Sequence, residues 1–439
     1  MKSITTCIRR TATTQLSRTK TVTVAFSTFT PSDAIQPSLN TPNLFAAFTA
    51  LANEHDAINL GQGFPTFGTP QFVLDNVTAA VSNPPYNQYS RPGGHPVLNE
   101  TLAGFYSTAT RFNKSLDPMA NVCTFTGAQG GLFNIIQSFC NPGDEICTIE
   151  PYFDAYKKAA DVVGAKTIGI PLRLSSSSST TTPTASDYTI DIDELRATLT
   201  PNTKILMLNT PHNPTGKVFG LEELQDIANV VRDFPDLFVV SDEVYEFSTF
   251  QPWTHHRFAN IEGMWDRTIS LYSAGKTFSC TGWRIGYAIG AAPLIAPLVA
   301  AQGVISFCTA TPLEIAVASS MVDAEKNGYF DTFANSLSQK QDAFAHSLKK
   351  CGLTPILAGG GYFVLADTSA VELPNGVEDE ERRDFAVAKH LTMEYGVTGI
   401  PTSPFYQDKN KGLSDNVLRF CFARNDEELE EAGRRLEKL

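Results

Sequence analysis

The stretch Ser273-Ala274-Gly275-Lys276-Thr277-Phe278, with Gly282-Trp283-Arg284-Ile285-Gly286 shortly after it, is the most informative part of this sequence. It follows a short apolar run, Thr268 to Tyr272, which predicts a strand. Lys276 then lies between the hydroxyl of Ser273 and the guanidinium of Arg284. A lysine beside such donors is suited to hold a phosphorylated aldehyde as a Schiff base. An exposed lysine in a turn is the alternative that this stretch alone leaves open.

A second segment, Asn209-Thr210-Pro211-His212-Asn213-Pro214-Thr215-Gly216, follows the apolar run Lys204 to Leu208. Its prolines end a strand and predict a turn. Asn213 then lies where a side-chain amide can donate to a ligand at the carboxyl end of the strand. A plain loop would also use Asn, Pro and Gly, so this segment indicates a site only in combination with others.

A third run, Leu237 to Ser241, leads into Asp242 and Tyr245. The run predicts a buried parallel strand that ends in a carboxylate. Such an aspartate either caps a helix or pairs with a pyridinium nitrogen, which the carboxylate keeps protonated and electron-poor. In the second case, Tyr245 could donate to the phenolate oxygen of the same ring.

The fourth segment, Thr126-Gly127-Ala128-Gln129-Gly130-Gly131-Leu132-Phe133, has glycines at the start of an apolar helix. Free backbone N–H groups at the positive end of a helix predict a phosphate site. The glycine spacing is not that of a dinucleotide-binding loop. Each of the four segments is expected at the carboxyl end of a strand, the edge of an open α/β sheet where ligands bind.

In this order the four segments resemble the fold-type-I pyridoxal-phosphate aminotransferases, and most closely the kynurenine/glutamine aminotransferase (cysteine-conjugate β-lyase) group. The resemblance runs from about Asn43 to the C-terminus. Four further stretches look like motifs of this group: Asn59-Leu60-Gly61-Gln62-Gly63-Phe64-Pro65, Asn87-Gln88-Tyr89, Glu150-Pro151-Tyr152-Phe153-Asp154-Ala155-Tyr156 and Leu418-Arg419-Phe420-Cys421-Phe422. The resemblance implies an α/β fold of type I, with a mostly parallel seven-stranded sheet between helices in a large domain, and a small α+β domain.

The resemblance also implies roles for individual residues. Lys276 would form the Schiff base with pyridoxal 5'-phosphate, Asp242 would pair with the ring nitrogen, and no metal is expected. The remaining cofactor contacts would come from Ala128, Gln129, Phe153, Asn213, Tyr245, Ser273 and Arg284, and from Tyr89 of a neighbouring subunit in a homodimer. The substrate carboxylate would be bound by Arg419, with Gly63 and Asn213, in a bidentate contact.

The implied reaction moves the α-amino group of a neutral or aromatic amino acid to a 2-oxo acid, with kynurenine–oxoglutarate transamination favoured and glutamine, methionine and phenylalanine left open. Many relatives have lysine at the position of Arg284, and the kynurenine group often has tryptophan at that of Phe45. Side-chain selection is expected from residues near Phe45, Phe64, Tyr89 and Tyr152, with His255 or Phe307 across the dimer.

Two other functions compete with this interpretation. A cysteine-S-conjugate β-lyase would use the same site and divert the same carbanion, so both activities are compatible with the sequence. A regulator that senses pyridoxal phosphate would need a DNA-binding module, and the sequence before Asn43 is too short for a winged helix. The formal net charge of −12 also argues against nucleic-acid binding.

Length and composition predict the organisation of the chain. Its 439 residues exceed a single average core, so we expect a large cofactor-binding domain over residues 76–325 and a small domain over 326–439. The family resemblance implies that residues 33–75 pack on the small domain. The eight cysteines form no Cys-x-x-Cys pair and indicate reduced thiols, and no apolar run reaches membrane length.

Two segments stand apart in composition. Residues 1–32 contain arginines, lysines, serines and threonines but no acidic residue, which is typical of a mitochondrial transit peptide and predicts a location in the mitochondrial matrix, with the cytoplasm as a further possibility. An ordinary disordered tail is the alternative. The serine- and threonine-rich run at residues 175–182 predicts a solvated loop, with phosphorylation as the less favoured interpretation.

Overall fold

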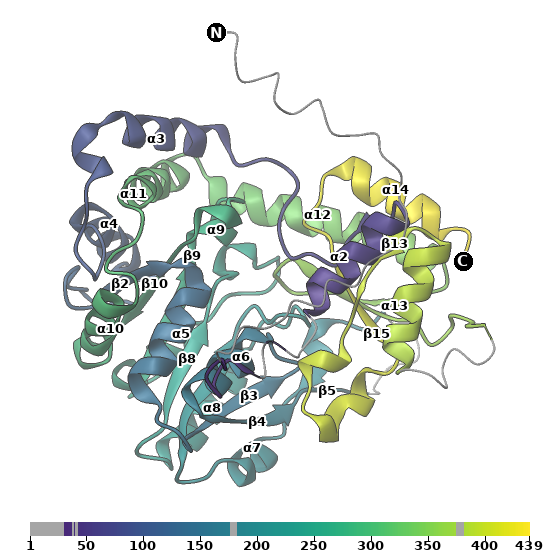
Figure 1. Cartoon of the computed structure of the whole chain (residues 1–439), viewed down its shortest axis with the longest axis horizontal. Helices are drawn as coiled ribbons and strands as arrows, with labels where there is room; N and C mark the ends of the chain where they lie inside the picture. Colours follow the sequence, from purple (N-terminus) through teal and green to yellow (C-terminus); the bar gives the residue numbers. More distant parts are fainter. Residues whose placement is uncertain (1–29, 37–38, 40–42, 176–181, 375–381) are drawn as a thin grey trace.

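The computed structural model describes residues 30–36, 39, 43–175, 182–374 and 382–439. Most of the proposed transit peptide and of the run at 175–182 therefore lies outside the described residues. The described chain forms two bodies side by side, a larger one around a wide sheet and a smaller one built mainly from the C-terminal part of the sequence (Figure 1). No helix among the described residues is long and apolar enough to cross a lipid bilayer.

The larger body is built on a seven-stranded sheet with the order β2-β10-β9-β8-β7-β3-β4. Its strands are β2 (Val122–Thr126), β3 (Glu145–Glu150), β4 (Lys166–Pro171), β7 (Thr203–Asn209), β8 (Phe238–Asp242), β9 (Thr268–Ser273) and β10 (Ile285–Gly290). Only β10 runs antiparallel to its neighbours within this sheet. The predicted mostly parallel, seven-stranded sheet is confirmed, and so is each predicted strand that precedes one of the four segments.

Helices cover both faces of this sheet, and the strands are apolar on both sides for that reason. In β7, Ile205 and Met207 pack into one core cluster, whereas Leu206 and Leu208 pack into another. One face carries α5 (Gly127–Phe139), α6 (Ala155–Val163) and α10 (Ala292–Ile305). The other carries α4 (Pro96–Tyr106), α7 (Ile192–Thr198), α8 (Leu221–Arg232) and α11 (Thr311–Lys326), with α3 (Gln71–Ser82) packed on α11.

The smaller body has a four-stranded antiparallel sheet of the order β11-β12-β15-β14. Its strands are β11 (Thr354–Ile356), β12 (Phe363–Asp367), β14 (Ile400–Pro401) and β15 (Val417–Cys421), and its helices are α12 (Tyr329–Lys350), α13 (Arg383–Glu394) and α14 (Asp426–Leu436). A short antiparallel ribbon, β5 (Arg173–Leu174) with β6 (Tyr188–Thr189), extends from the larger body.

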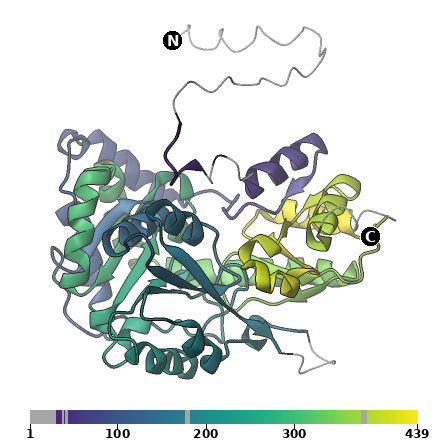
Figure 2. The same cartoon turned by 60° about the horizontal axis from the view of Figure 1, so that its bottom comes forward.

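The N-terminal helix α2 (Leu44–Glu54) lies against the smaller body in both views (Figures 1 and 2). Phe48 of α2 packs on Phe385 of α13, with ring centroids 6.1 Å apart. The chain then enters β1 (Ile58–Asn59), which pairs in parallel with β13 (Val397–Thr398). This pairing sets the start of the following loop, Gly61 to Phe64, which we call the mouth loop. The domain boundaries at residues 75 and 325 stay predictions.

Candidate active site

A cavity of about 390 Å³ lies where the carboxyl ends of four parallel strands meet the mouth loop and the smaller body. Strands β2, β7, β8 and β9 all end at this edge of the sheet, because each runs in the same direction. Every site residue expected from one chain lines the cavity: Gly63, Ala128, Gln129, Phe153, Asn213, Asp242, Tyr245, Ser273, Lys276, Arg284 and Arg419. Residues separated by more than 350 positions are thereby brought together.

Lys276 lies in the one-turn helix α9 (Ala274–Thr277), which follows β9 directly. Its Nζ donates to the carbonyl oxygen of Gly63 and lies 5.5 Å from the ring centroid of Tyr245. Removal from water lowers the pKa of Lys276 to about 8, and the nearby cation of Arg419 acts in the same direction. The alternative of an exposed lysine in a turn is wrong, since this amine faces the cavity, where burial makes its proton easier to remove.

Asp242 ends β8 and is buried, with only 7% of its surface exposed. One carboxylate oxygen accepts a hydrogen bond of 2.6 Å from the hydroxyl of Tyr156, and the other accepts one of 3.3 Å from the backbone N–H of Val244. Burial raises the pKa of Asp242 to about 6, although these hydrogen bonds oppose the rise. A buried carboxylate of this kind is stabilised in its charged form by a cationic partner, which a ring N–H⁺ in the cavity would be.

Asn213 connects the end of the central strands to the arginine of the smaller body. Its backbone N–H donates to the side chain of Asn209 over 2.6 Å, and Asn209 donates in turn to the backbone oxygen of Asp242 over 2.8 Å. The side-chain oxygen of Asn213 accepts from Nη1 of Arg419 over 3.2 Å. Asn209 and Tyr156 are site residues that the sequence interpretation missed. Both lie inside quoted motifs, which was the signal that could have identified them.

Arg419 projects from β15 and is 2% exposed. Its Nη2 donates to the carbonyl oxygen of Gly61 over 2.8 Å, and its guanidinium carbon lies 4.1 Å from the ring centroid of Phe363. The Nε of Arg419 has no hydrogen-bond partner among the described residues. Burial lowers the pKa of Arg419 to about 10, which leaves it charged at neutral pH. A buried guanidinium with an unused donor is suited to bind a carboxylate in the cavity.

Arg284 and the start of α5 form a cradle for an anion. A Cβ atom on Gly127 would lie 2.5 Å from Nη2 of Arg284, and one on Gly286 would lie 2.4 Å from the backbone nitrogen of Ala128. Both glycines are thus needed for the guanidinium and the helix N-terminus to approach each other. Ser273 pairs with Gly286 in the sheet and lines the cavity with a hydroxyl group. A helix N-terminus, a hydroxyl and a guanidinium together suit a phosphate group.

Some expected residues lie elsewhere. Tyr89 does not line the cavity of its own chain; 88% of its surface is exposed, and it packs edge-on against Phe307 at 5.6 Å. Phe45 and Phe64 do line the cavity, as expected for side-chain selection. The same expectation is wrong for Tyr152, whose hydroxyl accepts a hydrogen bond from Gln407 and which does not line the cavity. His255 contacts Glu243 within its own chain, and its role across the dimer stays a prediction.

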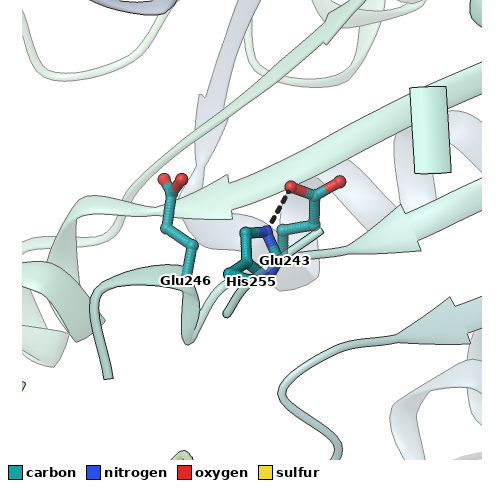
Figure 3. A group of neighbouring side chains, drawn as sticks. All are labelled: Glu243, Glu246 and His255. Atoms are coloured by element: carbon teal, nitrogen blue, oxygen red, sulfur yellow. Dashed lines mark hydrogen bonds and ion pairs between the residues drawn. The ribbon is translucent and has the colours of Figure 1, made fainter. Parts of the chain in front are cut away.

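His255 lies beside Glu243 and Glu246 in a polar cluster (Figure 3). Arg257, which is buried like the two glutamates, joins this cluster. Nε2 of His255 lies 2.9 Å from a carboxylate oxygen of Glu243, and Arg257 forms an ion pair with Glu246. Nε of Arg257 also lies 3.7 Å from a carboxylate oxygen of Glu243, and the hydroxyls of Tyr106, Ser270 and Tyr272 donate to the two carboxylates. Arg257 neutralises the negative charge of the two glutamates. We therefore assign the cluster a structural task, which is to hold the segment after β8 against β9.

The seven-stranded sheet and the cavity at its carboxyl edge are those of the fold-type-I transferases. The sequence matches the aminotransferase class I and II family over residues 55–436, and the chain belongs to that family. It is accordingly an aminotransferase, an enzyme that acts on amino acids and 2-oxo acids.

Three similar proteins place the chain more closely within the family. A kynurenine–oxoglutarate transaminase of Dictyostelium discoideum is 39% identical over 425 residues, which cover 94% of this chain and 97% of the relative. Bna3p from Saccharomyces cerevisiae has been suggested to be a kynurenine aminotransferase. Its crystal structure aligns with this chain at a TM-score of 0.87 and 31% identity, and the alignment covers 93% of this chain and 99% of Bna3p. YbdL of Escherichia coli, identified as a methionine aminotransferase, has a TM-score of 0.83 and 28% identity, with coverages of 94% and 100%.

Proposed function

We propose that this aminotransferase takes kynurenine or a similar neutral, aromatic amino acid as donor and 2-oxoglutarate as acceptor. The observation that carries the proposal is the 39% identity to a kynurenine–oxoglutarate transaminase over nearly the whole of both chains. The cavity agrees with it, because the phenylalanines Phe45, Phe64 and Phe363 line it beside Arg419. Aromatic walls favour an apolar or aromatic side chain over a charged one.

The cavity fits pyridoxal 5'-phosphate as cofactor. Its phosphate would be held by Ser273, Arg284 and the backbone of Ala128 and Gln129, and its ring by Phe153, Asn213, Asp242 and Tyr245. Bound there, the cofactor would supply an aldehyde for the amino group and an electron-withdrawing ring next to the α-carbon. The support for this assignment is the buried carboxylate of Asp242, whose pKa is raised by burial, in the same cavity as the amine of Lys276.

The side chains of the protein divide the remaining work. Arg419 binds the α-carboxylate through its fork and orients the amino acid, and Asn213 steadies the guanidinium. Lys276, with a pKa of about 8, takes the α-proton as a general base and returns a proton as a general acid. The hydroxyl of Tyr156 fixes the carboxylate of Asp242, which in its charged form would pair with the ring nitrogen and hold a proton on it. The kinetics should be ping-pong, because one substrate leaves before the next binds.

We also propose a homodimer in which Tyr89 reaches the cofactor phosphate of the partner. The support is a set of exposed apolar residues at and just after the end of α10, which a partner subunit would cover: Val304 is 89% exposed and Phe307 is 49% exposed. Sedimentation velocity should give a dimer. Tyr89→Phe should weaken binding of the cofactor phosphate without changing the mass of the dimer. A monomeric enzyme that is active would contradict the proposal.

For the location we propose the mitochondrial matrix, on the basis of the basic, acid-free composition of residues 1–32. Import of the full chain into isolated mitochondria, followed by N-terminal sequencing, checks this. Recovery of the uncleaved chain outside the organelle would contradict it.

The donor is tested with the cofactor-loaded enzyme and L-kynurenine in the absence of any 2-oxo acid. We expect a shift of the visible absorbance to shorter wavelength as the cofactor takes up the amino group, and reversal on adding 2-oxoglutarate. A shift with methionine or glutamine but not with kynurenine would replace the donor and leave the aminotransferase intact. Release of pyruvate and ammonia from a cysteine S-conjugate would show the lyase activity.

A further inference from the structure

Arg424, just after β15, is a buried cation with few partners. Only 3% of its surface is exposed, yet it forms no ion pair within the part of the chain that the structure describes, and its Nε there lacks a hydrogen-bond partner. Arginine is rarely buried to this extent without an anionic partner, because removing its charge from water is costly. The few contacts that Arg424 does make therefore indicate its task.

Those contacts are both with the mouth loop. Nη2 of Arg424 donates to the carbonyl oxygen of Gln62 over 2.7 Å, and the guanidinium carbon lies 5.0 Å from the ring centroid of Phe64. The first contact fixes the backbone of the loop, and the second is a cation–π contact with its aromatic side chain.

The other side of the loop is held by α2. Nε2 of Gln62 donates to Oγ1 of Thr49 over 2.7 Å and to the carbonyl oxygen of Phe45 over 3.2 Å. Gln62 is thus fixed through its side chain by α2 and through its carbonyl group by Arg424. Phe64 has less support, since 42% of its surface is exposed and it lines the cavity. Its cation–π contact with Arg424 is consequently a main constraint on the orientation of its ring.

The two arginines near the end of β15 have separate tasks. Arg419 contacts Gly61 and faces the place of the α-carboxylate, which all amino acids share. Arg424 contacts the following part of the loop and forms no ion pair among the described residues. We propose that Arg424 is a positioning residue for side-chain specificity, which holds Phe64 as a flat wall against aromatic side chains of the substrate. This rests on the proposed function, in which the donor is neutral and aromatic.

The test uses unreactive carboxylates, so that binding is measured apart from catalysis. Calorimetry on the cofactor-loaded enzyme would compare 3-phenylpropionate, which has a ring, with propionate, which has none. Arg424→Met should lower the preference for 3-phenylpropionate about tenfold, through loss of the cation–π contact and one hydrogen bond. Arg424→Lys keeps the charge and should restore part of the preference. Arg434→Met is the matched control, because Arg434 is an exposed arginine on α14.

Phe64→Leu provides a second route that does not depend on folding of the Arg424 variants, since Phe64 is exposed. It should lower the same preference about tenfold, and the double variant Arg424→Met/Phe64→Leu should lose no more than the larger single effect. An unchanged preference in Phe64→Leu, or equal weakening of both ligands in Arg424→Met, would overturn the proposal. Selective loss of glutarate binding in Arg424→Met would also overturn it and would make Arg424 a site for a second carboxylate.

Steady-state kinetics separates this inference from the proposed function. In Arg424→Met, KM for phenylalanine should rise about tenfold relative to KM for alanine, while kcat for both stays within about twofold. A wild-type enzyme that ignores kynurenine but retains the preference for 3-phenylpropionate would contradict the proposed donor and leave the inference intact.

Discussion

The two halves of the cavity are built in different ways. On the sheet side, Asp242, Ser273 and Lys276 lie at or just after the ends of parallel strands, and each is placed by its own neighbours in the sequence. On the other side, the mouth loop depends on contacts such as that between Gly61 and Arg419, which are 358 residues apart. The first half is therefore local in sequence and the second is made by the fold as a whole.

This difference separates the chemistry from the choice of substrate. The sheet side holds the groups that move protons and stabilise charge, and a rigid buried sheet keeps them in place. The mouth loop is held by α2 on one side and by the smaller body on the other, and it carries Phe64, which lines the cavity. Changes on the sheet side should reduce the rate for every substrate, whereas changes at the mouth should alter which substrate is preferred.

The largest effect is expected at Lys276. Lys276→Ala removes both the covalent attachment of the cofactor and the general base, so turnover should fall by at least about 10⁴-fold with every donor. After borohydride reduction, mass spectrometry should find the mass of the cofactor on the peptide that contains Lys276 in the wild type only. Lys157→Ala, on the exposed side of α6, serves as control. Retained turnover would disprove the assignment.

Arg419 tests the boundary between the two halves. Arg419→Met removes a bidentate contact worth about 3 kcal/mol, so KM should rise on the order of 10²-fold for all amino acids alike. Arg419→Lys keeps the charge without the planar fork and should recover only part of the loss. An effect confined to one substrate would mean that Arg419 recognises side chains, and the division between the two halves would not hold.

The local half is also the half that the sequence predicted well. The strands before Asn209, Asp242 and Ser273 were expected from their apolar runs, and the structure confirms them because alternate residues bury on both faces of the sheet. The contacts of Arg424 with the mouth loop could not be predicted, because nothing in the sequence around Arg424 indicates that the fold brings its side chain next to Gln62 and Phe64. The prediction for Tyr152 failed for a related reason, since membership of a motif does not determine the direction of a side chain.

Asp242 tests whether the sheet side is built for a cationic partner. Its pKa of about 6 in the folded chain lies above the ordinary value of 3.8. The folded state therefore binds its proton more tightly than the unfolded state, and stability from this group is lost as pH rises from about 3.8 to about 6. In the cofactor-free protein at pH 7, Asp242→Asn should raise the free energy of unfolding, by at most about 3 kcal/mol.

Urea unfolding at pH 4 and pH 7 checks this sign. Asp242→Asn should raise the free energy of unfolding at pH 7 and change it little at pH 4. Asp226→Asn, at an exposed position on α8, should leave the free energy of unfolding unchanged at both pH values. With the cofactor bound, the same Asp242→Asn substitution should slow turnover about 10²- to 10³-fold, because the charge that stabilises the ring proton is gone. A variant that is less stable than wild type at pH 7 without cofactor would contradict the electrostatic account.

The smallest effect concerns the hydroxyl of Tyr156, which donates to Asp242 over 2.6 Å. Tyr156→Phe removes a hydrogen bond worth about 1–2 kcal/mol and should raise the pKa of Asp242 further, so that kcat falls about 10-fold and KM changes little. The acidic limb of the kcat profile should move to higher pH. Tyr152→Phe is the matched control in the same motif, because its hydroxyl contacts Gln407 instead of the cavity. Equal losses of kcat in the two variants would mean that Tyr156 stabilises the fold and not the charge of Asp242. Tyr156 would then have no part in the chemistry of the sheet side.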